Sequence, residues 1–317
     1  MSNKLMSLKE AISQFVNDGD LIALGGFSTN RKPYALVREL IRQGKKDLYI
    51  ESGAAGGDVD LIIGAKLAKA VNMGYIANSG FSMVCRRFRA AVESGTLPVE
   101  DYSLDVQTIM YHGAALGLPY VAVKNMLGSD LVNKWGISED ERKNLPKLPA
   151  KKFVIQEDPF NPGSVLCLLP TPKIDVALIH VQKASPDGMC IIEGAEFQDV
   201  DIAMAARHTI ITCEEVVTDE EMRSHPEHNT LPGLCVSAVV ECQFGAHPSQ
   251  CFGHYDYDPV MMLEYDKASR TDEGFDDFLK KYAYVSHQEY LEKIGVGQLE
   301  KIKIDKNLGY AQNLKRR

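Results

Sequence analysis

The sequence predicts an α/β fold, with an open and mainly parallel sheet wrapped by helices. Along the 317 residues, short apolar runs typical of strands buried on both faces alternate with segments of helical spacing. Glycine-rich corners follow several of these runs, as at the strand-to-helix turns of an open sheet. We expect a single domain over 1–317, with a small irregular surface excursion at 138–163, where charged residues gather with four prolines.

The elements follow from local signals. Ser7 and Glu10 are spaced as a capping box, which predicts a helix over 8–17. Pro33 suits the first turn of a helix that ends before Gly44. Further helices are expected at 61–69, at 83–93 and, as an amphipathic outer layer, within 257–290. Strands are expected at 21–24, 48–50, 71–76, 121–123, 165–169, 176–180, 209–213 and 236–240.

Composition limits the possible partners. The formal net charge is -8, which argues against a nucleic-acid partner, because non-specific binding needs a basic face that neutralises phosphates. A single anion pocket needs only one or two local cations and stays possible. The seven cysteines include no CxxC pair and indicate reduced thiols. No apolar run approaches the roughly 20 residues of a membrane span. We therefore expect a cytoplasmic protein without a membrane partner.

The corner Gly25-Gly26-Phe27 is the most informative motif. It follows the run at 21–24 and precedes a polar loop, at the place where an open α/β sheet binds its ligand. Glycine permits positive φ and a close approach of the backbone, so N–H groups here could point at a ligand oxygen. A plain tight turn between strand and helix is the alternative.

Two more corners follow neighbouring strands. The stretch 53–58 reads Gly-Ala-Ala-Gly-Gly-Asp, which is neither G-x-G-x-x-G nor a P-loop, so we expect no dinucleotide or nucleotide phosphate site. This stretch and the first corner would together form a crevice that is lined by backbone atoms. In Asn78-Ser79-Gly80 the serine could donate a hydrogen bond to a substrate oxygen, or cap the next helix. No G-x-S-x-G surrounds it, so a hydrolase nucleophile is not expected.

Charged and metal-ligating residues give weaker signals. Glu51 directly follows a strand and could act as a covalent nucleophile, or be a surface glutamate at a strand end. The best placed cations for an anionic substrate are Arg31, Lys32, Arg86 and Arg87. We expect no metal site, because the spacing of the clustered ligands fits no zinc pattern: Cys242, His247, Cys251 and His254. His225 and His228 lie in a polar loop and are expected at the surface.

The stretch 18–33 resembles the alpha-subunit signature of the family I CoA-transferases. It has an acidic residue and glycine, then three apolar residues, Gly-Gly-Phe and a proline, with Arg31 in place of the signature's last glycine. Over about residues 5–290 the chain is most similar to A subunits of the glutaconate type. The stretches that carry this similarity include 53–58, 77–80, 86–89, 114–119, 135–138, 184–188, 197–203, 212–215 and 245–251.

The resemblance implies half of an enzyme. In this family the homologous B subunit carries a glutamate that attacks an acyl-CoA, forms a glutamyl-CoA thioester and passes CoA to a second acid. The resemblance implies no catalytic residue in this chain, CoA as substrate without a bound cofactor, and a higher AB oligomer, a hetero-octamer in the family. Gly25, Gly26 and Phe27 would close over the reacting centre, and Ser79 would bind the acid substrate. Arg31 is the residue expected to bear on dicarboxylate preference.

Two other functions stay open. Related hydrolases of cyclic acyl-CoA carry a catalytic carboxylate on the A chain, in the segment that resembles 100–105. Alignment places Ser103 there, as a substrate-binding residue, which favours transfer, although Asp101 and Asp105 lie close by. The second alternative is a non-catalytic CoA-binding partner. By the resemblance, Glu51 is a variable residue at a strand edge and not the nucleophile.

Overall fold

The main sheet is the frame of the molecule. The computed structural model describes residues 3–81, 83–312 and 314. The remaining residues of the predicted single domain, 1–2, 82, 313 and 315–317, lie outside the described part, and the single-domain organisation stays a prediction. β1 (Leu21–Leu24) pairs in parallel with β2 (Leu48–Ala55) on one side and β8 (Val176–Ala184) on the other.

The strand order is β11-β10-β8-β1-β2-β3-β4, with neighbouring strands parallel. The short β9 (Cys190–Ile191) pairs antiparallel with β8. The other strands are β3 (Ala68–Ile76), β4 (Val99–Asp101), β10 (His208–Val216) and β11 (Ala238–Glu241). The chain crosses the sheet in one direction from β1 to β4 and in the other from β8 to β11. The predicted open, mainly parallel sheet is confirmed, and its order reverses between β1 and β8.

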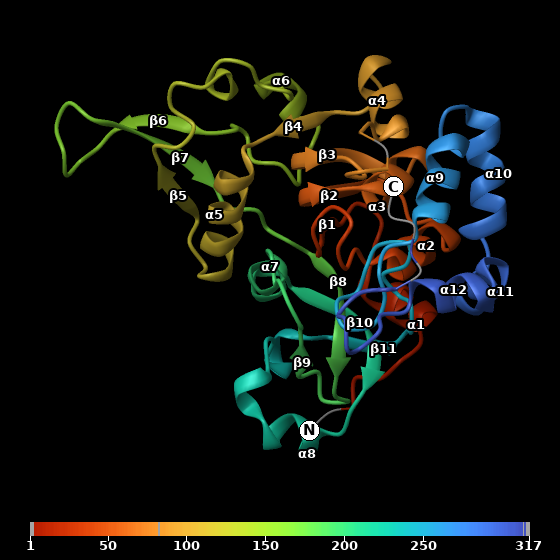
Figure 1. Ribbon diagram of the computed structural model, residues 1–317. Coiled ribbons are helices and arrows are strands. Elements are labelled where there is room, and N and C mark those ends of the chain that lie inside the picture. Colours follow the sequence, from red (N-terminus) through yellow and green to blue (C-terminus); the bar gives the residue numbers. More distant parts are fainter. Residues whose placement is uncertain (1–2, 82, 313, 315–317) are drawn as a thin grey trace.

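Helices cover both faces of this sheet (Figure 1). One face carries α1 (Leu8–Phe15), α2 (Tyr34–Arg42) and α3 (Gly57–Gly64), packed with the C-terminal helices around the largest apolar core. These C-terminal helices are α9 (Pro259–Ala268), α10 (Asp272–Tyr282) and α11 (His287–Ile294), whereas α12 (Val296–Ile302) packs in a separate small cluster around Tyr255. α5 (Leu104–Ala115) and α7 (Asp199–Ala205) cover the other face. Among the described residues, no helix is both long and apolar enough to cross a bilayer.

Short elements complete the fold: α4 (Arg86–Glu93), α6 (Glu139–Arg142), α8 (Asp219–Ser224) and the 3-10 turns Asp130–Val132, Pro226–His228 and Gly233–Cys235. The local signals near the N-terminus are confirmed, because the Ser7–Glu10 capping box opens α1 and Pro33 directly precedes α2.

A second, smaller sheet lies beside the first. It is antiparallel, in the order β5-β7-β6, and its β6–β7 hairpin projects from the body of the molecule (Figure 1). Its strands are β5 (Tyr120–Val123), β6 (Val154–Glu157) and β7 (Val165–Pro170). The prediction that the runs at 121–123 and 165–169 belong to the parallel sheet is therefore wrong. A short apolar run identifies a strand but not the direction of its partner.

α5 was not predicted from the sequence, because this helix is buried on two sides. Val106 and Met110 pack in the core of the small sheet, whereas Tyr111 packs in the core of the main sheet. A helix between two sheets lacks the single apolar stripe that makes a surface helix recognisable. α5 therefore joins the two sheets without showing the expected pattern.

The predicted irregular surface excursion at 138–163 is only partly irregular and is firmly anchored. It contains α6 and β6, and its Arg142 and Lys152 side chains are buried. Both cations meet the carboxylate of Glu100, which is fully buried in β4, at 2.5 and 2.8 Å. Glu100 also accepts the N–H of Gly136 at 3.1 Å. One buried carboxylate therefore fastens this segment to the sheet.

We predict that Glu100→Gln destabilises the protein. It removes the anion, leaves buried Arg142 without its counter-charge and leaves Lys152 with only Asp101 at 3.6 Å, which typically costs about 3–5 kcal/mol of unfolding free energy. Urea unfolding of the purified chain measures this loss. Asp130→Asn is the control, because it breaks an ion pair with Lys134 in which both side chains are largely exposed, and it should leave the midpoint unchanged. Equal midpoints for both variants would contradict the anchoring role.

Candidate functional site

The three corners predicted from the sequence meet at the carboxyl ends of β1, β2 and β3. The Ser28 N–H donates to the carbonyl of Ala54 at 3.0 Å, and its hydroxyl donates to Ser79 Oγ at 3.1 Å. Gly57 N–H donates to Asn78 Oδ1 at 2.8 Å and joins the second corner to the third. The corners thus form one contiguous edge beside the point where the strand order reverses, which is where open α/β sheets bind ligands.

The two glycines of the first corner are required by its geometry. Gly26 has φ +72°, and a Cβ there would lie 2.6 Å from the carbonyl oxygen of Arg31. A Cβ on Gly25 would lie 2.7 Å from Asp199 Oδ1. A side chain at Gly25 would displace Asp199 at the start of α7, and one at Gly26 would displace the loop backbone at Arg31.

The backbone of this corner does not form a free cradle of N–H donors, which corrects one interpretation of the sequence. Four consecutive N–H groups already donate to acceptors inside the chain. Gly25 donates to Leu178 O at 2.9 Å, and Gly26 donates to Asp199 Oδ1 at 2.7 Å. Phe27 donates to Asn30 O at 2.9 Å, and Ser28 donates to Ala54 O at 3.0 Å. An oxyanion would find no donor among these four groups.

Hydroxyl groups and aromatic rings supply the chemistry that this edge presents. The exposed Ser79 hydroxyl lies 2.7 Å from the Tyr75 hydroxyl, so a ligand oxygen could bond to either. The Phe27 ring stacks on the ring of Phe197, with centroids 5.0 Å apart. The sequence analysis did not single out Tyr75 or Phe197. Phe197 belongs to the similar stretch 197–203, and Tyr75 lies four residues before Ser79.

Arg31 is buried, with only 2% of its surface exposed. Its guanidinium forms an ion pair with Asp199 at 2.6 Å and donates to the carbonyls of His180 and Ala195 at 2.9 and 2.7 Å. These partners occupy the guanidinium inside the chain. The geometry therefore favours a positioning role for Arg31 over the expected contact with substrate.

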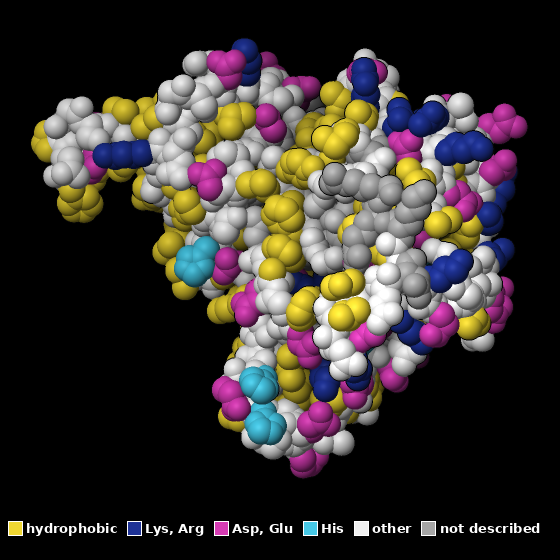
Figure 2. Space-filling model, viewed as in Figure 1, with side chains coloured by type: hydrophobic (Ala, Val, Ile, Leu, Met, Phe, Trp, Pro, Cys, Tyr) yellow, Lys and Arg dark blue, Asp and Glu magenta, His cyan; other side chains and the backbone are white. Residues whose placement is uncertain are grey.

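The other three candidate cations are also paired with carboxylates. The pairs are Lys32–Asp58 at 3.0 Å, Arg86–Asp266 at 2.8 Å and Arg87–Asp272 at 2.6 Å. On the face in Figure 2, basic side chains lie next to acidic ones over α9 and α10. None of the four cations proposed from the sequence is thus left without a carboxylate partner.

Glu51 lies inside β2 and is 3% exposed, so it is not the strand-end surface residue that the sequence suggested. Asn72 donates to its carboxylate at 2.7 Å and Tyr111 at 3.1 Å, with Gln107 at 3.4 Å. Burial raises the pKa of Glu51 to about 7, although these three hydrogen bonds oppose the shift. The enclosed carboxyl is not placed to attack a thioester at the corner.

The position considered for a hydrolase carboxylate lies further along the edge. Ser103 is the N-cap residue of α5, after β4, one strand beyond the Ser79 corner. Asp105 accepts a hydrogen bond from Asn125 at 2.5 Å, and Asp101 lies 3.6 Å from Lys152. Both acids are held by neighbours, and Ser103 is the residue at the position itself.

The cysteines and histidines considered for a metal do not gather into one group. Both ring nitrogens of His247 have partners, with Tyr290 at 2.6 Å and Asp258 at 3.1 Å. Across the described ranges, one cluster has the composition of a metal site, and it consists of His180, Glu214 and Cys251.

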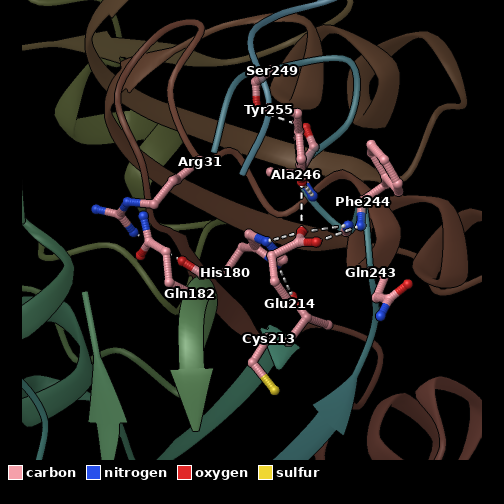
Figure 3. Close-up of polar contacts among 12 residues, drawn as sticks. Arg31, His180, Gln182, Cys213, Glu214, Gln243, Phe244, Ala246, Ser249 and Tyr255 are labelled. Carbon is pink, nitrogen blue, oxygen red and sulfur yellow. Dashed lines mark hydrogen bonds and ion pairs between the residues drawn. The ribbon is translucent and has the colours of Figure 1, made fainter. Parts of the chain in front are cut away.

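In this cluster the Glu214 carboxylate already has protein partners (Figure 3). It accepts from His180 at 2.8 Å, from the Tyr255 hydroxyl at 2.7 Å and from the N–H of Phe244 at 2.8 Å. His180 Nδ1 bonds to Thr212. Although burial opposes it, the hydrogen bonds from His180 and Tyr255 and the nearby imidazole lower the pKa of Glu214. This cluster joins β8 and β10 to the loop after β11, and its hydrogen bonds favour a structural role over metal binding.

We predict that Glu51 makes stability depend on pH near neutrality. The folded chain keeps this proton up to about pH 7, whereas an unfolded glutamate releases it near pH 4.3. The unfolding free energy should therefore fall by about 3 kcal/mol as the pH rises between these values, and stay level above them. Glu51→Gln should remove this fall.

The measurement is urea unfolding of wild type and Glu51→Gln at about pH 5 and about pH 8. Asp60→Asn is the comparison, because burial also raises the pKa of Asp60, to about 6: this variant should lose the fall that Asp60 contributes and keep the fall, extending to about pH 7, that Glu51 contributes. A Glu51→Gln protein with the full wild-type slope would contradict the prediction.

Comparison with known proteins agrees with this geometry. A family model described as Coenzyme A transferase matches residues 5–242. The chain is 52% identical over 310 residues to the A subunit of glutaconate CoA-transferase from Acidaminococcus fermentans, covering 97% of both chains. It is 33% identical over 301 residues to the A subunit of 3-oxoadipate CoA-transferase from Pseudomonas knackmussii, covering 93% of this chain and 99% of that protein.

A solved structure gives the same result. The crystal structure of glutaconate coenzyme A-transferase from Acidaminococcus fermentans superimposes with a TM-score of 0.96 at 51% identity, over 99% of this chain and 100% of that chain. The resemblance identified in the sequence is confirmed, and the chain belongs to the coenzyme A transferase family.

Proposed function

We propose that this chain is the A subunit of a two-chain cytoplasmic CoA-transferase that moves CoA between an acyl-CoA and a dicarboxylate such as glutaconate or 2-hydroxyglutarate. The observation that carries the proposal is an incomplete site. The edge at Ser79 offers hydroxyls and aromatic surface, whereas the buried carboxyls beside it already have partners. Asp58 pairs with Lys32 and Asp199 with Arg31, and Glu51 is enclosed by Asn72, Gln107 and Tyr111. The attacking carboxylate must then come from a second chain.

The chemistry is covalent catalysis in two equivalent halves. The B subunit supplies a glutamate, which attacks the thioester carbonyl and releases CoA thiolate, so that an acyl anhydride is left. The thiolate then attacks the glutamyl carbonyl and releases the first acid, so that CoA is held as a glutamyl thioester. The second acid reverses both steps. Each step exchanges bonds of similar energy, and the thioester must be kept from water.

In this scheme the described chain forms one wall of the site. Gly25, Gly26 and Phe27 allow the wall to approach the reacting carbonyl closely. Ser79 donates to the acid substrate, and Ser103 contributes at the end of β4 in place of the carboxylate of the related hydrolases. A hetero-octamer of AB pairs is the assembly that the resemblance implies.

Trapping the intermediate in the assembled enzyme tests the proposal. The co-purified A and B chains are incubated with glutaconyl-CoA or glutaryl-CoA and treated with borohydride or hydroxylamine, and the modified residue is located by mass spectrometry. We expect the label on one glutamate of the B chain, and formation of a new acyl-CoA, with no free CoA, when an acceptor acid is added. Label on Glu51 would contradict the proposal, as would hydrolysis of the acyl-CoA without an acceptor.

We predict that Ser79→Ala weakens use of the acid substrate. Loss of one hydrogen bond costs about 1 kcal/mol, so kcat/KM for the acid should fall about fivefold to tenfold while KM for the acyl-CoA stays unchanged. The control is Ser94→Ala, because the Ser94 hydroxyl caps the end of α4 by bonding to Ala91. An equal loss for both substrates, or none, would argue against this role of Ser79.

A further inference from the structure

One buried carboxylate connects Arg31 to the backbone of the first corner. Asp199 is fully buried, and its Oδ2 accepts from the Arg31 guanidinium at 2.6 Å. Its Oδ1 accepts the N–H of Gly26 at 2.7 Å. The same carboxylate therefore binds a cation and fixes the residue at which the chain turns after β1.

Arg31 extends this connection to two other segments. Its guanidinium donates to the carbonyl of His180 in β8 and to the carbonyl of Ala195 in the segment before α7. It also lies 5.8 Å from the ring of Phe197, which itself stacks on Phe27. Arg31 thus connects the loop after β1 to β8 and to the segment before α7, in addition to the direct pairing of β1 with β8.

The backbone of this unit is held in unusual conformations. Arg31, Ser28 and Phe197 have φ values of +46°, +54° and +52°, a region that side chains other than glycine rarely adopt. Such residues persist only where the surroundings impose them, and they cluster at functional sites. Three of them in one contact network indicate that the shape of the corner is enforced.

A buried ion pair is weak support for stability, since an apolar replacement of the same volume is often at least as stable. What such a pair contributes is orientation, because the planar guanidinium of Arg and the two carboxylate oxygens bond in only a narrow range of geometries. Here the second carboxylate oxygen of Asp199 accepts the Gly26 N–H. The geometry of the ion pair therefore also determines the position of the Gly26 backbone.

We propose that Arg31 and Asp199 are positioning residues, which set the conformation of Gly25-Gly26-Phe27 for acyl transfer and do not touch the substrate. This inference rests on the proposed function, in which that corner closes over the reacting carbonyl. Arg31 then influences catalysis through Asp199 rather than through the charge of a substrate carboxylate.

The test uses the assembled A and B chains, with Arg31→Ala and Asp199→Asn. A misplacement of about 1 Å can cost about 100-fold in rate, so we expect kcat to fall by that order while KM for the dicarboxylate stays within about twofold. Guanidinium at millimolar concentration should restore part of kcat to Arg31→Ala. A purely structural role would not give this rescue or this separation of kcat from KM.

Asp60→Asn is the matched control. Asp60 is also a fully buried carboxylate that accepts from a backbone N–H, that of Phe88, and from a side chain, the hydroxyl of Tyr265. The same chemical change there should leave kcat at the wild-type value, whatever it does to stability. Phe197→Leu is a milder variant for the case that Asp199→Asn does not assemble, because Phe197 is 38% exposed and its loss removes only the ring's contacts with Phe27 and with the Arg31 guanidinium. It should lower kcat without changing KM.

A readout without activity separates this inference from the proposed function. In the purified chain, Asp199→Asn should speed hydrogen exchange of the Gly26 amide by about tenfold or more, because the acceptor loses its charge, whereas Asp60→Asn should not. Wild-type exchange in Asp199→Asn would overturn the inference. A higher KM for dicarboxylates but not monocarboxylates in Arg31→Ala, with kcat unchanged, would overturn it too. Failure of the wild-type complex to transfer CoA would refute the proposed function while leaving the exchange result intact.

Discussion

The parallel pairing of β1 with both β2 and β8 determines the geometry of the whole edge. Leu21–Leu24 is buried on both faces, and Gly25 continues the pairing one residue further through its bond to Leu178. α2 follows β1 on one face of the sheet and α7 precedes β10 on the other, so the loop after β1 emerges where covering helices diverge. Ser28 reaches Ser79, and Gly26 reaches Asp199, only because these strands are held in register.

Buried ion pairs then fix the conformation of the loops that follow the strands. Arg31 and Lys32 are consecutive, yet Arg31 holds the start of α7 through Asp199, and Lys32 holds the start of α3 through Asp58. Glu100 does the same for the segment at 138–163. Since burying charge gives little net stability, these pairs are best understood as devices that select one conformation of each loop.

The parts that could be predicted from the sequence are those with local causes. Strand β1, the capping box of α1 and the glycine corners follow from neighbouring residues, and the position of the corners follows from the rules of open sheets. The roles of Arg31 and Glu51 could not be predicted in this way. The partner of Arg31 lies 168 residues away, and Tyr111, which encloses Glu51, belongs to a helix buried on two sides. Neither contact leaves a periodic signal.

The pairing of these cations has a chemical consequence in the proposed reaction. A free guanidinium on this wall would pair with the attacking carboxylate or with the acid substrate, and would lower the nucleophilicity of either. Asp199 removes that competition by neutralising Arg31 inside the chain. The wall at Ser79 and Phe27 is left uncharged and can exclude water without holding the nucleophile back. The positive charge that an anionic acyl-CoA and a dicarboxylate need is therefore not expected from Arg31.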